Sequence, residues 1–321
     1  MANSTSNHTL SSSHGILTEP LDTWYWIIRG IIAVLTITGN GLIIYFITCR
    51  RHLRVTSNWF VLSLAIADFS IGLFVTPSEF ACKFYFRCDW YLQIVFYNFL
   101  LFSSTTNLWA MAIDRYIGIV HSLRYASLVT SERVIAMVAI AWSSTFAATF
   151  VRLLWFQNDH FQQKIEKYYR VAVDVLFGIV SCLLLIFIYL RIVFISRKVS
   201  KQIITQAVHI NHNYKPKELK FRSRHRRQNL STSLLGSVIL LFLLCNSLTV
   251  SLSFCFTYRL CSIEPVLMKV AYLLVHLNSS VNFVVYALIK KDIRLEIKRM
   301  FRCRNSVEPP QTSFSIVENI P

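Results

Sequence analysis

The sequence predicts an all-α integral membrane protein, a bundle of seven transmembrane helices followed by a short amphipathic eighth helix. Its 321 residues are 54% hydrophobic and only 15% charged, with a mean hydropathy of +0.48. This is more apolar surface than one soluble core can bury. Several stretches longer than eighteen residues carry almost no charge, and that is the length needed to cross about 30 Å of hydrocarbon.

Seven such stretches define a transmembrane region over residues 24–289. They are separated by polar or charged connections, and no long segment remains for a separate soluble domain. In chain order the predicted spans are Trp24–Cys49, Asn58–Phe80, Trp90–Ile119, Val134–Phe156, Val171–Ile195, Leu230–Thr257 and Pro265–Ile289.

The distribution of positive charge predicts the orientation. The formal net charge is +17, which in a soluble protein would suggest a nucleic-acid partner. Here most Lys and Arg residues follow the first, third, fifth and seventh spans, so the positive-inside rule places those connections in the cytosol. We therefore expect no nucleic-acid partner. Residues 1–23 are then predicted to be an extracellular segment, in which Asn3 and Asn7 are candidate glycosylation sites.

Two short segments follow the last span. Residues 290–302 place Ile293 and Ile297 on one face and basic residues elsewhere, which predicts an amphipathic helix on the inner leaflet with membrane lipid as its partner. Cys303 beside it is either a palmitoylation site or a plain free cysteine. Residues 303–321 are predicted to be a disordered cytosolic tail.

Four cysteines fall outside the spans on the predicted outer side, where the compartment is oxidising. They are Cys82, Cys88, Cys255 and Cys261. Four cysteines allow three connectivities. The simplest joins near neighbours, Cys82 with Cys88 and Cys255 with Cys261, and metal binding is the weaker interpretation.

A carboxylate inside hydrocarbon is costly, so Asp68 in the second span is a candidate functional residue. Polar side chains predicted at a similar depth would surround it. One interpretation is a hydrogen-bonded packing motif between helices, worth about 0.6 kcal/mol per contact. The other, which we favour, is a wet cluster that holds a monovalent metal cation at Asp68, or a proton that can be switched. The other predicted members are Asn40, Ser104, Asn278, Ser279 and Asn282.

An acid and a base end the third span, in the order Asp114-Arg115-Tyr116. With this tripeptide and one or more landmarks in every other span, the chain resembles the rhodopsin-like (class A) G-protein-coupled receptors from the first helix to the amphipathic helix. The remaining landmarks are Gly39-Asn40, Leu64 to Asp68, Trp142, Tyr189, Phe242 with Cys245, Asn278-Ser279, and Asn282 to Tyr286.

The resemblance implies a plasma-membrane receptor that binds an extracellular small molecule or peptide and activates a heterotrimeric G protein, with a receptor dimer as a further partner. It implies that Asp114 holds Arg115 at rest, and that Arg115 receives the G protein when the sixth helix moves outward. It implies that Tyr189 and Tyr286 then form a hydrogen-bonded bridge. The polar cluster around Asp68 matches the sodium pocket of the family, so an allosteric sodium ion is expected and no other cofactor.

The chain departs from the family in the devices that bend its helices. The sixth helix reads Cys245-Asn246-Ser247-Leu248 where relatives carry an aromatic toggle and a proline, and Phe283 replaces a proline in the seventh. The fifth helix has no proline, so we expect these three helices to be straighter than usual. The sixth helix also begins without the acid that holds the arginine in many relatives, which predicts raised basal activity.

The outer half of the bundle holds the candidate ligand pocket. Arg29, Glu79 and His276 are expected to converge between the first, second and seventh helices, either as an internal ion pair or as a subsite for a polar ligand group. Asp174 in the fifth helix is the predicted ligand anchor. It is expected to face two residues of the third helix, Tyr97 and Asn98.

Several features place the chain within the class. The usual disulfide to the second outer connection cannot form, because residues 158–170 contain no cysteine. The spacing of Cys255 and Cys261 resembles that in melanocortin receptors, and His276 stands where adenosine receptors carry histidine, which points weakly to the melanocortin, adenosine and cannabinoid cluster. Tyr97 stands where an amine receptor would carry aspartate.

Two other functions remain as alternatives. The altered sixth and seventh helices are also compatible with a non-coupling decoy or scaffold that modulates other receptors. A transporter is disfavoured because no repeated half is found. The sequence shows no hydrolytic triad, metal cluster or phosphate-binding loop, so an enzyme is not expected.

Overall fold

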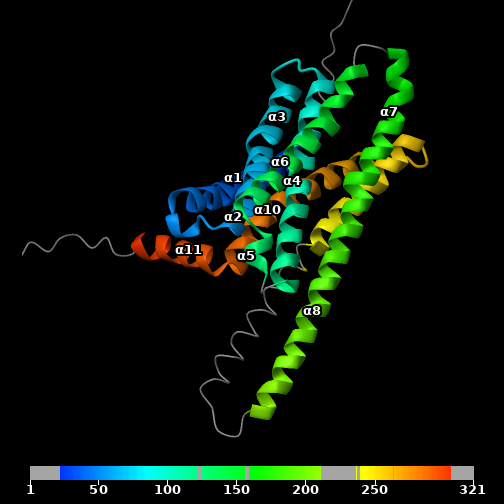
Figure 1. Cartoon of the computed structure of the whole chain (residues 1–321). Helices are drawn as coiled ribbons and strands as arrows, with labels where there is room; N and C mark the ends of the chain where they lie inside the picture. Colours follow the sequence, from blue (N-terminus) through cyan, green and yellow to red (C-terminus); the bar gives the residue numbers. More distant parts are fainter. Residues whose placement is uncertain are drawn as a thin grey trace, which may run out of the picture.

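The computed structural model describes residues 22–121, 124–155, 159–210, 236, 239–262 and 264–304. Within these residues the chain is helical apart from short connections (Figure 1). The predicted glycosylation sites Asn3 and Asn7, the side chain of Cys303 and the tail from residue 305 lie outside the described residues.

The described helices correspond to the predicted spans, and the fifth extends well beyond its predicted ends, Val171 and Ile195, to Asp159 and Ile210. The first four spans correspond to α1 (Thr23–Cys49), to α2 (Thr56–Ser70) with η2 (Ile71–Val75) and α3 (Thr76–Phe84), to α4 (Trp90–Val120), and to α6 (Ser131–Phe150) with η3 (Val151–Trp155). The next are α7 (Asp159–Val173) with η4 (Asp174–Val180) and α8 (Ser181–Ile210), then the helix Ile239–Tyr258, and α10 (Pro265–Ile289). Shorter elements are η1 (Arg51–Leu53), α5 (Tyr125–Leu128) and α11 (Lys291–Arg304).

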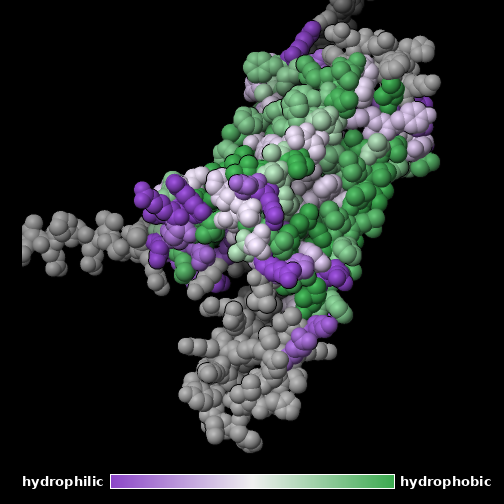
Figure 2. All heavy atoms as spheres, viewed as in Figure 1, coloured by the Kyte–Doolittle hydropathy of each residue, from purple (hydrophilic) through white to green (hydrophobic). Residues whose placement is uncertain are grey.

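Length and composition alone make five stretches of the described chain suitable for crossing a membrane. They are Thr23–Cys49, Thr56–Phe84, Ser131–Trp155, Ile165–Lys198 and Ile239–Tyr258. Within the described residues, α4 and α10 add two more long helices, of 31 and 25 residues. Apolar side chains cover the middle of the bundle, and hydrophilic ones gather over α11 (Figure 2). This is the distribution that a bilayer requires.

The long helix α4 lies in the middle of the bundle and contacts α2, α6 and α8, while α1 packs against α2 and α10. The central place of α4 explains why many of its polar residues are buried, since they face protein and not lipid. Phe283 of α10, which replaces the family's proline, fits against Gly39 of α1. A Cβ at Gly39 would lie 2.1 Å from the Phe283 ring, so only glycine allows this approach.

The absence of prolines, from which straighter fifth, sixth and seventh helices are expected, does not make all three of them regular α-helices. The helix Ile239–Tyr258 and α10 are continuous α-helices. The fifth contains the π-helical segment η4, and a second π-helical segment, η2, precedes Pro77 in the second helix. A π-turn needs no proline where neighbouring groups bind the displaced carbonyls. The hydroxyl of Ser181, the first residue of α8, donates a hydrogen bond to the carbonyl oxygen of Phe177 in η4 at 2.6 Å.

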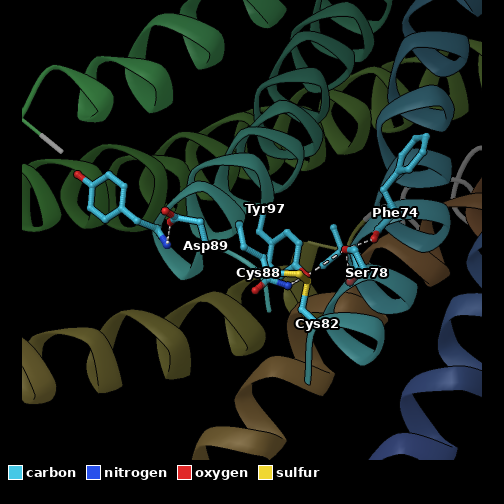
Figure 3. Close-up of a disulfide and its surroundings, with 9 residues drawn as sticks. Phe74, Ser78, Cys82, Cys88, Asp89 and Tyr97 are labelled. Carbon is cyan, nitrogen blue, oxygen red and sulfur yellow. Dashed lines mark hydrogen bonds between the residues drawn. A yellow bond between two sulfur atoms is a disulfide. The ribbon is translucent and has the colours of Figure 1, made fainter. Parts of the chain in front are cut away.

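Both nearest-neighbour disulfides are present. Cys82–Cys88 links the end of α3 to the residues before α4 (Figure 3), and Cys255–Cys261 closes the turn before α10. Asp89, next to the first disulfide, caps α4 because its Oδ1 accepts hydrogen bonds from the backbone N–H groups of Tyr91 and Leu92 at 2.9 and 3.1 Å.

The second outer connection, predicted as a loop, begins the helix α7 and is fixed by a buried arginine. Arg152 lies at the outer end of the fourth helix and forms an ion pair with Glu166 of α7. Its guanidinium lies 4.5 Å from the ring centre of Tyr91 in α4, and the Tyr91 hydroxyl donates to the Arg152 carbonyl at 2.9 Å. These contacts connect the third, fourth and fifth helices where relatives use a disulfide.

We expect Arg152→Met to lower the thermal unfolding midpoint of the purified protein strongly. Removing Arg152 leaves Glu166 with only the longer ion pair to Arg170, at 3.5 Å, so the cost approaches that of a buried charge that has lost its partner, about 3 kcal/mol. Arg87→Met, at an exposed arginine on the same side, should change the midpoint little. Adding Glu166→Gln to Arg152→Met should recover part of the loss. If Arg152→Met and Arg87→Met have equal unfolding midpoints, the Arg152–Glu166 ion pair does not stabilise the fold.

Candidate functional site

A charged lock closes the inner end of α4. Asp114 is buried, and its Oδ2 accepts hydrogen bonds from Arg115 Nε at 3.0 Å and Nη2 at 2.7 Å. Tyr125 of α5 donates to the other carboxylate oxygen at 2.6 Å. Burial and the neighbouring Asp114 raise the pKa of Tyr125, so its hydroxyl stays protonated and remains a donor. The structure therefore holds Arg115 in the arrangement expected at rest.

The two tyrosines expected to bridge on activation do not donate to each other within the described residues. Tyr286 is buried, and its hydroxyl has no hydrogen-bond partner there. The Tyr189 hydroxyl lies against Gly236, 2.2 Å from where a Cβ would stand. Tyr116, the third residue of the inner motif, packs against the hydrophobic core. The absence of a hydrogen bond between Tyr189 and Tyr286 in the described chain agrees with Arg115 being held by Asp114.

Lys290, between α10 and α11, is a functional candidate that the sequence did not reveal. Its Nζ donates to Asn58 Oδ1 and, at 3.2 Å, to the Ser57 carbonyl at the start of α2. Burial, followed by the positive charge of Arg115, lowers the pKa of Lys290 to about 7. The lysine thus joins the inner ends of the second and seventh helices beside the lock.

The predicted polar core forms around Asp68. This side chain is fully buried, and it accepts hydrogen bonds from Ser104 Oγ at 2.6 Å and Asn282 Nδ2 at 2.9 Å. It is therefore better paired than a lone intramembrane carboxylate. The two donors come from α4 and α10, so Asp68 joins three helices.

Two amide oxygens of the polar core have no partner. Asn40 uses its Nδ2 to donate to the Thr36 carbonyl at 3.0 Å and to the Ser279 carbonyl at 3.3 Å. The Oδ1 atoms of Asn40 and Asn278 are buried and have no hydrogen-bond partner within the described residues. Such oxygens are expected to bind water or a cation. No cluster of three or more His, Cys, Asp or Glu residues suited to a metal occurs in the described chain.

The structure brings Arg29, Glu79 and His276 together, as expected. Arg29 is almost completely buried and pairs with Glu79 through Nη2, which also lies 3.3 Å from His276 Nε2. Its Nη1 donates to the Tyr25 hydroxyl, and its Nε lies 3.5 Å from Thr76 Oγ1. All three guanidinium nitrogens therefore have partners. This favours the internal ion pair over a ligand subsite at Arg29.

Asp174 is contacted from a different direction than expected. Ser253 of the sixth helix donates to its Oδ2. Tyr97 instead turns toward α3, where its hydroxyl lies 3.0 Å from Ser78 Oγ (Figure 3). Asn98, half-buried, lies next to it on α4. Ser253 was missed because a serine in an apolar helix gives no sequence signal of its partner.

Comparison with known proteins agrees with this geometry. Residues 39–286 match the family described as 7 transmembrane receptor (rhodopsin family). The chain is 32% identical to the adenosine receptor A2a of Homo sapiens, over 84% of this chain and 70% of that receptor. It is 28% identical to the histamine H2 receptor of Homo sapiens, over 87% and 79%. It is 26% identical to the octopamine receptor beta-2R of Chilo suppressalis, over 85% and 78%.

The matched region runs from Gly39 in α1 to Tyr286 in α10 and includes the polar core and the inner lock. Both are the landmarks on which the resemblance was based. The chain is therefore a multi-pass membrane protein of the rhodopsin family of seven-transmembrane receptors, a family of receptors and not of enzymes.

Proposed function

We propose that this receptor lies in the plasma membrane with its N-terminus outside, binds an extracellular small molecule or peptide, and activates a heterotrimeric G protein. The observation that carries the proposal is the Asp114–Arg115 lock, in which Arg115 has a side chain 32% exposed at the inner end of the bundle. A charge held this way can be released when helices move, because its pair is only partly shielded from water.

The relatives and the polar side chains in the outer half of the bundle both favour a small polar ligand. The relatives are named for adenosine, histamine and octopamine, which are small polar molecules. In this chain Tyr97 offers a hydroxyl, and Asp174 offers a carboxylate that is bound by the neutral Ser253 hydroxyl and interacts with the positive charge of Arg170. A positively charged ligand group would form a stronger hydrogen bond with this carboxylate than the neutral hydroxyl does. We therefore keep Asp174 as the anchor, with Tyr97 and Asn98 as secondary contacts.

A non-coupling decoy remains the second candidate, because Asn246 replaces the aromatic toggle of relatives and Phe283 replaces a proline that bends their seventh helix. Nucleotide exchange separates the two. The purified receptor in lipid nanodiscs should accelerate GTP binding by at least one of a panel of G proteins, even without ligand. Arg115→Ala should abolish the acceleration by removing the group that contacts the G protein. Arg51→Ala, an exposed arginine near α1, is the matched control. Exchange no faster than with empty nanodiscs across the panel would favour the decoy.

We also propose that the polar core holds one sodium ion, with the family's sodium pocket as the precedent. Asp68 and Ser104, with the unpaired Asn40 and Asn278 oxygens, offer the hard oxygen ligands that such a cation prefers. Bound sodium would stabilise this arrangement of the second, third and seventh helices.

We expect the unfolding midpoint to rise by about 3 °C when sodium chloride replaces N-methylglucamine chloride at equal ionic strength. A ligand present at about ten times its Kd stabilises by about 1.4 kcal/mol, and each kcal/mol shifts the midpoint by about 2–4 °C in a chain of this size. Asp68→Asn should remove the dependence on sodium. Equal midpoints of the original protein in both salts would disprove the site.

For ligands found by screening amines, nucleosides and short peptides, we expect Asp174→Asn to weaken the response by about tenfold or more, since it removes a charged acceptor without changing shape. The half-maximal concentration in the exchange assay measures this. Glu264→Gln, an exposed outer carboxylate, is the control. An unchanged half-maximal concentration for every ligand would exclude Asp174 as the anchor.

A further inference from the structure

The π-helical segment of the fifth helix meets one face of the sixth. Three residues of the helix Ile239–Tyr258 contact residues of η4. They are Asn246, Val250 and Ser253, which are spaced four and three residues apart. This spacing places them on one side of a helix. We call these contacts the helix 5–6 seam, formed by Asp174, Phe177 and Gly178 on the fifth helix and Asn246, Val250 and Ser253 on the sixth.

Asn246 adds an interhelical donor to carbonyl groups of the π-turn. Its Nδ2 lies 3.2 Å from the Gly178 oxygen and 3.4 Å from the Phe177 oxygen. Both oxygens also accept from Ser181, Gly178 from its backbone N–H and Phe177 from its hydroxyl. An interhelical hydrogen bond of this kind contributes about 0.6 kcal/mol in a membrane. The amide therefore links the π-turn to the neighbouring helix, at the position where relatives carry an aromatic toggle.

Gly178 lets the two helices approach closely. A Cβ at this glycine would lie 2.3 Å from Val250 Cγ2, a distance that no pair of carbon atoms can adopt without movement. Small residues at helix contacts allow such approach in membranes. The separation of the fifth and sixth helices at this level is therefore set by Gly178 and Val250.

The seam also reaches the lock-bearing helix. The Phe177 ring stacks on Phe102 of α4, with ring centres 4.2 Å apart and an angle of 4° between the planes, and lies 6.2 Å from the Trp109 ring. At its outer end, Asp174 accepts the Ser253 hydrogen bond. One π-helical segment therefore carries the predicted ligand anchor and contacts both the sixth helix and α4.

We propose that the helix 5–6 seam sets the position of the sixth helix and replaces the missing toggle and proline, with Asn246 as its positioning residue. The inference rests on the proposed function for the claim that a ligand acts at the outer end. A ligand group that takes the place of Ser253 at Asp174 shifts the π-turn, and the carbonyls then leave Asn246. The sixth helix is freed to move as a straight rod.

The close contact gives the sharpest test. Spin labels at Ile135→Cys and Leu240→Cys, both exposed positions, report the distance between the fourth and sixth helices in a background with Cys49 and Cys303 replaced by Ser. Gly178→Ala should lengthen this distance and raise ligand-free nucleotide exchange. Adding Val250→Ala should restore both values. Gly30→Ala is the matched control, because a Cβ there would meet nothing within 4 Å.

The amide gives a second test. Asn246→Leu should shift the ratio of long to short label distances about threefold for each hydrogen bond lost, whereas Asn246→Gln, which keeps an amide, should shift it less. Label shifts without nucleotide exchange support the seam and count against G-protein coupling. Equal distances in Gly178→Ala and Gly30→Ala, or no restoration by Val250→Ala, would overturn the seam itself.

Discussion

The buried charged groups of the described chain are paired inside the protein, because hydrocarbon offers them no partner. The requirement explains why buried charges occur in sets. Arg29 engages Glu79, Tyr25 and Thr76, and Arg152 engages Glu166 across two helices. Asp68 is held by neutral donors, Ser104, Asn282 and Ser279. Each set joins helices that are distant in the chain, so the same contacts that neutralise charge also fix how the helices pack.

The sequence predicted the parts of the fold that depend on length and depth. Uncharged stretches marked the spans, and a shared depth brought Arg29, Glu79 and His276 together correctly. It could not predict the π-turn in the fifth helix, because hydrogen-bond register leaves no trace in composition. Nor could it predict Ser253 as the partner of Asp174, or Tyr125 as the partner that Asp114 has besides Arg115. Both are ordinary residues whose role depends on how helices rotate about their axes.

The departures from the family are compensated locally. Phe283 replaces a proline, and Gly39 provides the space for its ring. Asn246 replaces an aromatic residue, and the carbonyls of the fifth helix provide its partners. In each case one large or polar side chain meets a site on a neighbouring helix that accepts it. The altered positions therefore form new interhelical contacts, where a degenerating sequence would leave cavities or unpaired groups.

The contacts that hold the two ends of the bundle differ in strength. The outer half has two disulfides and two ion pairs in which the arginine is at most 7% exposed. At the inner end, Arg115 is 32% exposed and its partner is the adjacent residue. Water and salt weaken an exposed pair far more than a buried one. Helix movement is therefore expected to cost less at the end that carries the Asp114–Arg115 lock than at the end that carries the disulfides, and the proposed function needs the opening at the lock.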